Sequence, residues 1–179
     1  QLYWEAFGAK LGKVLGPDET ATRFIAQAMD PRFALVARGD NNAMLGLAGF
    51  KTREGAMVGG AFAQFLRHYG VLGTVWRLPL LALTHRAPSK NGFLMDGLCV
   101  SSAARGMGLG TALLDAIKAE ATQRRLHHVR LDVIDTNPRA RALYEREGFV
   151  ATKTRAIGPF RHVYGFRNVT EMHWDVPAT

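Results

Sequence analysis

The chain has 179 residues, of which 47% are hydrophobic and 21% are charged, and this ordinary globular composition excludes a largely disordered protein. A chain of this length can bury a sizeable core, so we expect one domain over residues 1–179. The formal net charge of +8 favours anionic partners, which include a phosphorylated cofactor, a nucleic acid, an acidic peptide and a membrane surface.

Cysteine usage and the first residues bear on the compartment. Cys99 is the only cysteine, so no disulfide can form within the chain, and a reducing, cytoplasmic environment is expected. No signal peptide is evident, because Glu5, Lys10 and Lys13 interrupt any apolar run near the start.

One apolar segment, residues 71–83, raises the question of a membrane span. The segment is short and contains Arg77 and Pro79, whereas a spanning helix needs about 20 apolar residues. We therefore expect no membrane partner.

The first part of the chain is expected to combine two helices with one hairpin. Hydrophobic periodicity predicts helices over residues 2–15 and 19–29. Two short apolar runs, residues 33–37 and 44–50, flank the turn-forming cluster 39–42 and predict an antiparallel pair of strands.

Residues 55–84 are the least regular stretch, rich in small and apolar residues, with Gly70 and Gly73 near the middle. We predict two helical segments that break near Tyr69–Gly73, because glycine is a poor helix former.

The second part of the chain predicts a strand–helix–strand–helix–strand unit over residues 93–156, which indicates a mixed α/β fold. Its members are a strand at 93–100, a helix at 108–125, a strand at 129–133, and a helix that Asn137 caps and Gly148 closes. Two strands joined through Gly158-Pro159 are predicted within residues 149–176.

A glycine-rich turn, residues 105–111, follows a predicted strand and opens a predicted helix. Glycines let a ligand approach the backbone, and the N–H groups and dipole of a helix start attract a phosphate or pyrophosphate. The alternative is a tight turn whose glycines serve packing only. The spacing is not the G-x-G-x-x-G of a dinucleotide site, and the Gly-Lys-Ser/Thr of a Walker loop is absent.

Two ordered motifs carry a family resemblance. Residues 105–110, Arg-Gly-Met-Gly-Leu-Gly, match R/Q-x-x-G-x-G/A, and residues 137–149 match N-x-x-A-x-x-L-Y-x-x-x-G-F. With the preceding strand at Leu98 to Val100, this pattern resembles the GCN5-related N-acetyltransferase (GNAT) family. The detailed match covers residues 93–150, while the first half of the chain is compatible only loosely. Members of the family normally begin with a strand, whereas this sequence begins within the predicted first helix. The family's first strand, at the edge of the sheet, is therefore expected to be missing from this sequence.

The resemblance implies a central mixed, mostly antiparallel sheet flanked by helices, with a splayed cofactor cleft. It also implies an N-acetyltransferase that moves the acetyl group of acetyl-CoA directly to a primary amine on a small molecule or peptide. The cofactor-binding residues that it implies are Leu98, Cys99 and Val100 for the pantetheine arm, Arg105, Gly106, Met107, Gly108, Leu109, Gly110 and Thr111 for the pyrophosphate, and Asn137 and Arg141 along the other side. The alternatives are a helix cap for Asn137 and a solvated side chain for Arg141.

The resemblance also suggests the catalytic groups. Tyr144 holds the position of the family's general acid, and a phenol is protonated at neutral pH; the alternative is a core tyrosine. Asp96 holds the position where many members carry a glutamate base, and the alternative is a surface or salt-bridged aspartate. Glu54 and Glu171 stay open as bases.

Two further chemistries are not favoured. Cys99 as a nucleophile has no partner histidine suggested by the sequence, and a strand cysteine is usually a small buried hydrophobe. The six histidines show no metal-ligand spacing, so no metal is expected.

The acceptor amine is expected to contact residues 1–30, residues 55–90 and the final strands. The 55–90 segment carries apolar side chains that suit an acceptor pocket wall, a homodimer surface or ordinary core packing: Phe62, Phe65, Leu66, Trp76, Leu80 and Leu81.

Two rival functions remain. A non-catalytic acyl-CoA sensor would bind the cofactor without turnover, and a nucleic-acid-associated protein would bind RNA or DNA with a steep dependence on salt. The second rival ranks last, because no aromatic-rich RNA motif accompanies the charge.

Overall fold

The computed structural model describes residues 2–16, 18–59, 62–84, 87–88 and 91–177. In chain order the elements are α1 (Leu2–Leu15), α2 (Asp18–Ala28), the 3-10 turn η1 (Pro31–Phe33), β1 (Ala34–Arg38), β2 (Met44–Lys51), α3 (Phe62–Thr84), β3 (Gly92–Val100), the 3-10 turn η2 (Ser102–Ala104), α4 (Leu109–Gln123), β4 (His128–Ile134), α5 (Pro138–Arg146), β5 (Val150–Ala156), the 3-10 turn η3 (Gly158–Phe160), α6 (Arg161–Tyr164) and β6 (Asn168–Asp175).

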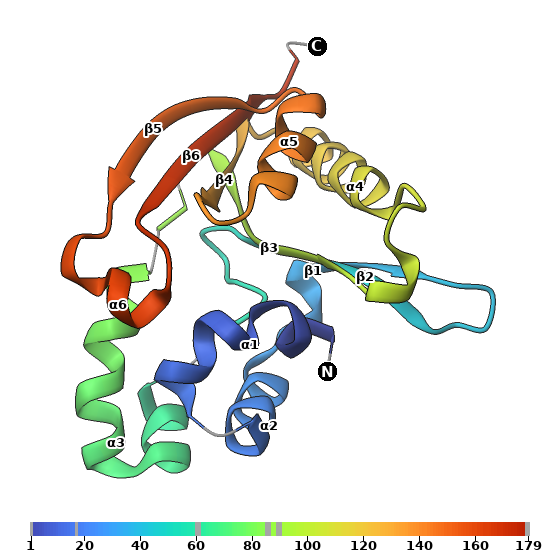
Figure 1. Cartoon of the computed structure of the whole chain (residues 1–179). Coiled ribbons are helices and arrows are strands. Elements are labelled where there is room, and N and C mark those ends of the chain that lie inside the picture. Colours follow the sequence, from blue (N-terminus) through green and yellow to red (C-terminus); the bar gives the residue numbers. More distant parts are fainter. Residues whose placement is uncertain (1, 17, 60–61, 85–86, 89–90, 178–179) are drawn as a thin grey trace.

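The described residues form a mixed six-stranded sheet with the strand order β1-β2-β3-β4-β6-β5. Every pairing is antiparallel except that of β3 with β4. Figure 1 shows α4 and α5 gathered on one side of the sheet and α1, α2 and α3 on the other. The predicted mixed, mostly antiparallel sheet flanked by helices is therefore confirmed.

The single parallel pairing is short. β3 and β4 pair only through Gly92↔His128, Phe93↔Val129 and Leu94↔Arg130. Beyond these residues β3 continues to pair with β2, and β4 continues to pair with β6, up to the ends of both strands. The facing edges of β3 after Leu94 and of β4 after Arg130 therefore part, which gives the expected splay.

A bulge interrupts β3 where the splay begins. Gly97 pairs with Gly49 and Met95 pairs with Phe50, so Asp96 is the extra residue between them. A bulge of this kind re-aims the side chains around it. The Asp96 carboxylate then comes within 4.0 Å of Lys51 Nζ at the end of β2.

Three apolar clusters hold the layers together. The largest joins the sheet to α4 and α5 and includes Leu114, Leu131 and Met172. A second joins α1, α2 and α3 around Phe24, whose ring centroid lies 4.5 Å from that of Phe65. The third packs the β5–β6 connection onto Val14 at the end of α1.

The predicted helix is wrong at residues 55–59. This segment runs beside the sheet, with isolated bridges Met29↔Val58 and Lys51↔Ala56. Met57 is buried, and its N–H donates to the carbonyl of Phe50 while its own carbonyl accepts from Asp30. An extended path brings Met57 under the sheet, which the small residues of this stretch did not reveal.

The predicted break in residues 55–84 is observed. Gly70 has φ 63° and ψ −179° inside α3, and it divides the helix into two parts. Phe65 is buried in core packing, whereas Val71, Leu72 and Val75 are exposed. The side chains of Phe62, Trp76, Leu80 and Leu81 lie outside the described residues.

The connection between the last two strands is also longer than predicted. Instead of one turn at Gly158-Pro159, it contains η3 and the one-turn helix α6. Tyr164 and Phe166 are buried against α1, so the apolar side chains of this segment pack as a cap and not as strand. Within the described ranges, no helix combines the length and the apolar character that crossing a bilayer needs.

The contact between Gly97 and α1 gives a prediction about stability. A Cβ at Gly97 would lie 2.7 Å from Phe7 Cζ and 3.1 Å from Phe7 Cε2. Gly97→Ala is expected to displace Phe7 and to lower the free energy of unfolding by about 1–3 kcal/mol. Urea denaturation checks this. The control is Gly59→Ala, where the nearest atom is 3.9 Å away and a change within about 0.5 kcal/mol is expected. Equal losses in the two variants would contradict the close packing of α1 on β3.

Candidate active site

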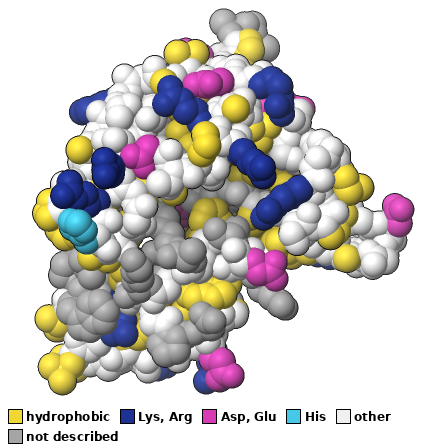
Figure 2. Space-filling model, viewed as in Figure 1, with side chains coloured by type: hydrophobic (Ala, Val, Ile, Leu, Met, Phe, Trp, Pro, Cys, Tyr) yellow, Lys and Arg dark blue, Asp and Glu magenta, His cyan; other side chains and the backbone are white. Residues whose placement is uncertain are grey.

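The splay between β3 and β4 opens toward the starts of two helices. Because the two strands are parallel, both of their C-terminal ends lie at the same edge of the sheet, and α4 and α5 begin just beyond them. Figure 2, in the same view, shows that this face of the molecule is hollowed near its centre, with Lys and Arg side chains on both sides of the hollow.

The glycine-rich turn before α4 is open to solvent. Gly106 has φ 82° and Gly108 has φ 77°. Residues with a Cβ rarely adopt this left-handed backbone conformation. A Cβ at either glycine would meet no protein atom within 4 Å. The glycines are therefore needed for the backbone path, and the space in front of the turn is open.

Backbone donors line this space. The first bond from α4 back into the turn is from Ala112 N to the carbonyl of Gly108. Among the described residues, the N–H groups of residues 106–111 donate to no carbonyl and no side chain. Such donors, together with the positive end of the helix dipole, make an anion site. Arg105 is exposed beside the turn and adds a permanent positive charge.

The last two residues of the turn also fasten α4 to α5. A Cβ at Gly110 would lie 3.0 Å from Leu143 Cδ2, so a glycine allows the two helices to approach closely. The Thr111 hydroxyl donates to Glu147 Oε1 at 2.8 Å, and Lys118 Nζ lies 3.5 Å from Glu147 Oε2. The side chain of Thr111 is thus committed to α5, and what it offers a ligand is its backbone N–H.

Asn137 and Arg141 both take up the alternative roles considered from the sequence. Asn137 caps α5, because its Oδ1 accepts from Ala140 N at 3.2 Å. Arg141 Nε donates to Glu145 Oε1 at 2.8 Å, and the side chain is 49% exposed. Neither role uses the Asn137 amide nitrogen or the terminal nitrogens of Arg141, so both residues keep hydrogen-bond donors.

Tyr144 is buried on α5. Its ring packs against Phe149, with the centroids 6.0 Å apart, and the residue is only 7% exposed. Burial raises the pKa of Tyr144 to about 12, so the phenol keeps its proton at any ordinary pH. No hydrogen bond joins its hydroxyl to another described residue, and this oxygen is not among the fully enclosed unpartnered atoms. A buried ring with an available proton donor suits a general acid.

Asp96 faces α1, on the other side of the sheet from Tyr144. The carboxylate is 28% exposed and lies near Lys51 and Tyr3. The pKa of Tyr3 is raised by burial and further by the charge of Asp96 nearby. No hydrogen bond or ion pair joins Asp96 to Tyr144. The structure therefore places the two candidate catalytic groups on opposite sides of the splay.

Tyr3 and Lys51 are neighbours of Asp96 that sequence reasoning missed. Lys51 lies near Asp96 at the bulge, where the register between β2 and β3 shifts by one residue. Tyr3 comes from α1, far away in the chain. No spacing in the sequence connects these residues, and only the resemblance marked Asp96.

The two other candidate bases differ in position. Glu54 is 79% exposed and pairs with Arg124 at the end of α4 that lies away from the glycine turn. Glu171 on β6 is half-buried; its Oε1 lies 3.0 Å from His173 Nε2, and its Oε2 lies 3.9 Å from Arg130 Nε. The position of Glu54 disfavours it as a base, whereas Glu171, half-buried beside Arg130 and His173, stays open.

Cys99 is enclosed within the sheet. It is 5% exposed, and burial raises the pKa of its thiol to about 11. A protonated, enclosed thiol is a poor nucleophile, which agrees with a structural role for the side chain. In the part of the chain that the structure describes, no group of three or more His, Cys, Asp or Glu side chains is placed to hold a metal ion.

The family model described as "Acetyltransferase (GNAT) family" matches residues 1–149 of this chain. A search of the curated proteins found no match. The matched range contains both diverging strands, the glycine-rich turn and α5.

Solved structures of acetyltransferases share the fold. A GCN5-related N-acetyltransferase from Kribbella flavida has a TM-score of 0.61 and 18% identity, over 95% of this chain and 88% of its own. The ribosomal-protein-S18-alanine N-acetyltransferase of Escherichia coli has a TM-score of 0.57 and 19% identity, over 89% of this chain and 78% of its own.

A third similar structure carries a ligand. A Bacillus anthracis protein described as a streptothricin acetyltransferase, solved in complex with acetyl coenzyme A, has a TM-score of 0.55 and 14% identity, over 80% of this chain and 62% of its own. At such identities these structures speak for the fold alone, and the family follows from the match over residues 1–149. This chain belongs to the acetyltransferase (GNAT) family and is an acyltransferase.

Proposed function

We propose that this acyltransferase moves the acetyl group of acetyl-CoA to a primary amine by direct transfer, and that the whole chain acts as one domain. The observation that carries the proposal is the splay between β3 and β4, with the free N–H groups of residues 106–111 at its open edge. A pyrophosphate group bound at the turn would direct the rest of the cofactor into the splay. The acetyl-CoA complex of the similar Bacillus anthracis protein supports this choice of donor.

The cofactor would use backbone groups for most of its contacts. The pyrophosphate would accept hydrogen bonds from the backbone of residues 105–111, and Arg105 would add a charged donor. The pantetheine arm would pair with the free edge of β3 at Leu98, Cys99 and Val100, in place of a neighbouring strand. Asn137 and Arg141 would contact the cofactor from α5 with the donors that their present bonds leave unused.

The transfer itself would use one acid and one base. The neutral amine attacks the thioester carbonyl, a carbon–nitrogen bond forms, and the carbon–sulfur bond breaks. Tyr144 would give its phenolic proton to the leaving thiolate. Asp96 would accept the proton that the amine loses, directly or through water, at the point where the strands part. Lys51 would hold the Asp96 carboxylate in place.

The experiment is to measure free-thiol release from acetyl-CoA across a panel of polyamines, amino acids, aminoglycosides and peptide N-termini. Release that depends on one amine class would establish the transfer and name the acceptor. If the protein binds acetyl-CoA but releases no thiol with any acceptor, the sensor function would replace the enzyme as the better explanation.

The glycine-rich turn gives the first prediction for this function. Gly108→Trp places a side chain in the open space before the turn and forces a left-handed backbone that costs about 1–2 kcal/mol. We expect acetyl-CoA affinity to fall by about tenfold or more, measured by titration calorimetry. Gly158→Trp is the matched control, because Gly158 also has a positive φ of 61° and open space around it. Unchanged affinity in folded Gly108→Trp protein would remove the basis of the cofactor site.

Tyr144 gives the second prediction. Tyr144→Phe keeps the buried ring and removes only the proton donor, so kcat is expected to fall by about 10²-fold or more while acetyl-CoA affinity is unchanged. Since burial raises the Tyr144 pKa to about 12, loss of this proton should not limit the rate below about pH 10. Tyr164→Phe, at another buried tyrosine, is the control. A kcat within twofold of the parent protein would exclude Tyr144 as the acid.

A further inference from the structure

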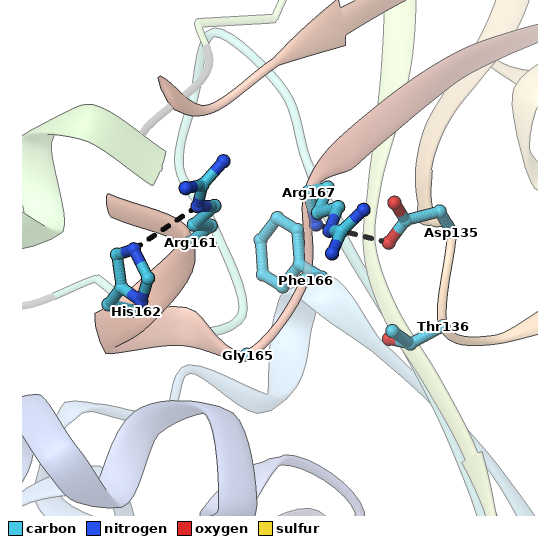
Figure 3. Close-up of a pocket in the computed structure, with 7 residues that line it drawn as sticks. All are labelled: Asp135, Thr136, Arg161, His162, Gly165, Phe166 and Arg167. Carbon is cyan, nitrogen blue, oxygen red and sulfur yellow. Dashed lines mark hydrogen bonds between the residues drawn. The ribbon is translucent and has the colours of Figure 1, made fainter. Parts of the chain in front are cut away.

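A pocket of about 440 Å³ lies between the end of β4 and the β5–β6 connection. Figure 3 shows the residues that line it: Asp135, Thr136, Arg161, His162, Gly165, Phe166 and Arg167. Two arginines and one histidine are among these residues. We call them the basic pocket residues: Arg161, His162 and Arg167. None of the roles proposed above for transfer uses them.

The pocket adjoins the splay. Asp135 and Thr136 directly follow β4, one of the two diverging strands, and directly precede Asn137 at the start of α5. The connection that supplies the other lining residues packs onto Val14 of α1 through Tyr164 and Phe166. The pocket thus lies toward the α1 side of the sheet, the same side as Asp96, and away from the glycine turn of α4.

The charges of the two arginines are available. Arg161 and Arg167 are both exposed, and no carboxylate among the described residues lies within ion-pair distance of either. Arg161 Nε donates to His162 Nε2 at 3.2 Å, which leaves its terminal nitrogens to point elsewhere. Two guanidinium groups beside one pocket form a site for a carboxylate or a phosphate, which arginine binds through paired hydrogen bonds.

The acid in the pocket has a different task. Asp135 accepts hydrogen bonds from Arg167 N at 3.3 Å, from Asn168 N at 2.9 Å and from Asn168 Nδ2 at 3.2 Å. These bonds fasten the end of the β5–β6 connection to the end of β4. They hold the backbone of Arg167 in place. The guanidinium group of Arg167 is therefore attached to a fixed part of the pocket lining.

We propose that the basic pocket residues bind an anionic group, a carboxylate or a phosphate, that the acceptor amine carries elsewhere in its structure. This inference rests on the proposed acetyl transfer to an amine. The pyrophosphate of the cofactor would be held at the start of α4, so the charges near α6 remain for the second substrate. A basic pocket on the acceptor side would select amines that also bear a negative charge.

The strand geometry sets the spacing between the two ends of such a substrate. Leu94 is level with Arg130, so the bulge at Asp96 is nearly level with the middle of β4, about three residues before Asp135. At about 3.3 Å per residue, the pocket begins on the order of 10 Å from the expected point of transfer. An amine and an anionic group separated by a chain of that length would reach both sites.

The test compares ω-aminoalkanoic acids of increasing length with n-alkylamines of the same length, by thiol release from acetyl-CoA. The carboxylate is expected to lower the acceptor KM by about tenfold or more in the longer acids, as for one charge-assisted contact. In Arg161→Gln/Arg167→Gln this advantage should vanish, while the KM for acetyl-CoA stays the same. Arg23→Gln, an exposed arginine on α2, is the matched control for charge loss. An advantage that survives in the double variant would overturn the proposal.

A binding measurement separates this inference from the proposed function. Titration of glutarate and of inorganic phosphate into the parent protein and the double variant requires no turnover. Loss of anion binding in the double variant alone supports the basic pocket, whether or not any amine is acetylated. Equal binding, or none to the parent protein, overturns it. CoA and 3′-dephospho-CoA are titrated in parallel. If the double variant weakens only the binding of CoA, the pocket serves the cofactor's phosphate and the proposal fails.

Discussion

The early separation of β3 from β4 is the constraint on which the rest of the structure depends. Two parallel strands normally satisfy each other's backbone groups along their length, yet here the ladder ends at Leu94↔Arg130. Exposed strand edges invite pairing. The sheet remains intact because β2 and β6 support the two strands from outside. A cofactor arm with amide groups can therefore occupy the place of a missing strand without disturbing the fold.

The separation of β3 from β4 also places the candidate catalytic residues on two different sides. The glycine turn and Tyr144 belong to the side of α4 and α5, whereas Asp96, Lys51 and Tyr3 gather toward α1. A donor that passes through the splay would present its thioester between them, with a proton donor near sulfur on one side and a proton acceptor near the amine on the other. The bulge matters here because it contains Asp96, whose carboxylate lies 4.0 Å from Lys51 Nζ.

Local signals in the sequence were sufficient for the strand–helix–strand–helix–strand unit over residues 93–156. The glycines before α4, the Asn137 cap and Gly148 mark helix ends through backbone conformations that few other residues adopt. The structure departs from prediction where tertiary contacts decide: Met57 draws residues 55–59 into an extended path, and Tyr164 and Phe166 pack on Val14 as part of a cap. The approach of Lys51 to Asp96 accompanies a one-residue shift in register, and Tyr3 reaches Asp96 from α1; no spacing along the chain encodes either contact. The site assignments themselves stay predictions.

The positions of the basic side chains help to explain the net positive charge of the protein. A net charge of +8 by itself suggested several anionic partners, including nucleic acid. In the structure many basic side chains are paired on the surface, as Arg141 is with Glu145 and Arg32 is with Asp30, and such pairs contribute little to binding. Arg105 beside the glycine turn, and Arg161 with Arg167 at the pocket near the end of β4, lack such partners among the described residues. Two small, separate groups of basic side chains suit the two anionic ligands proposed above better than they suit a continuous polyanion. This distribution supports the proposed transferase over a nucleic-acid-binding protein.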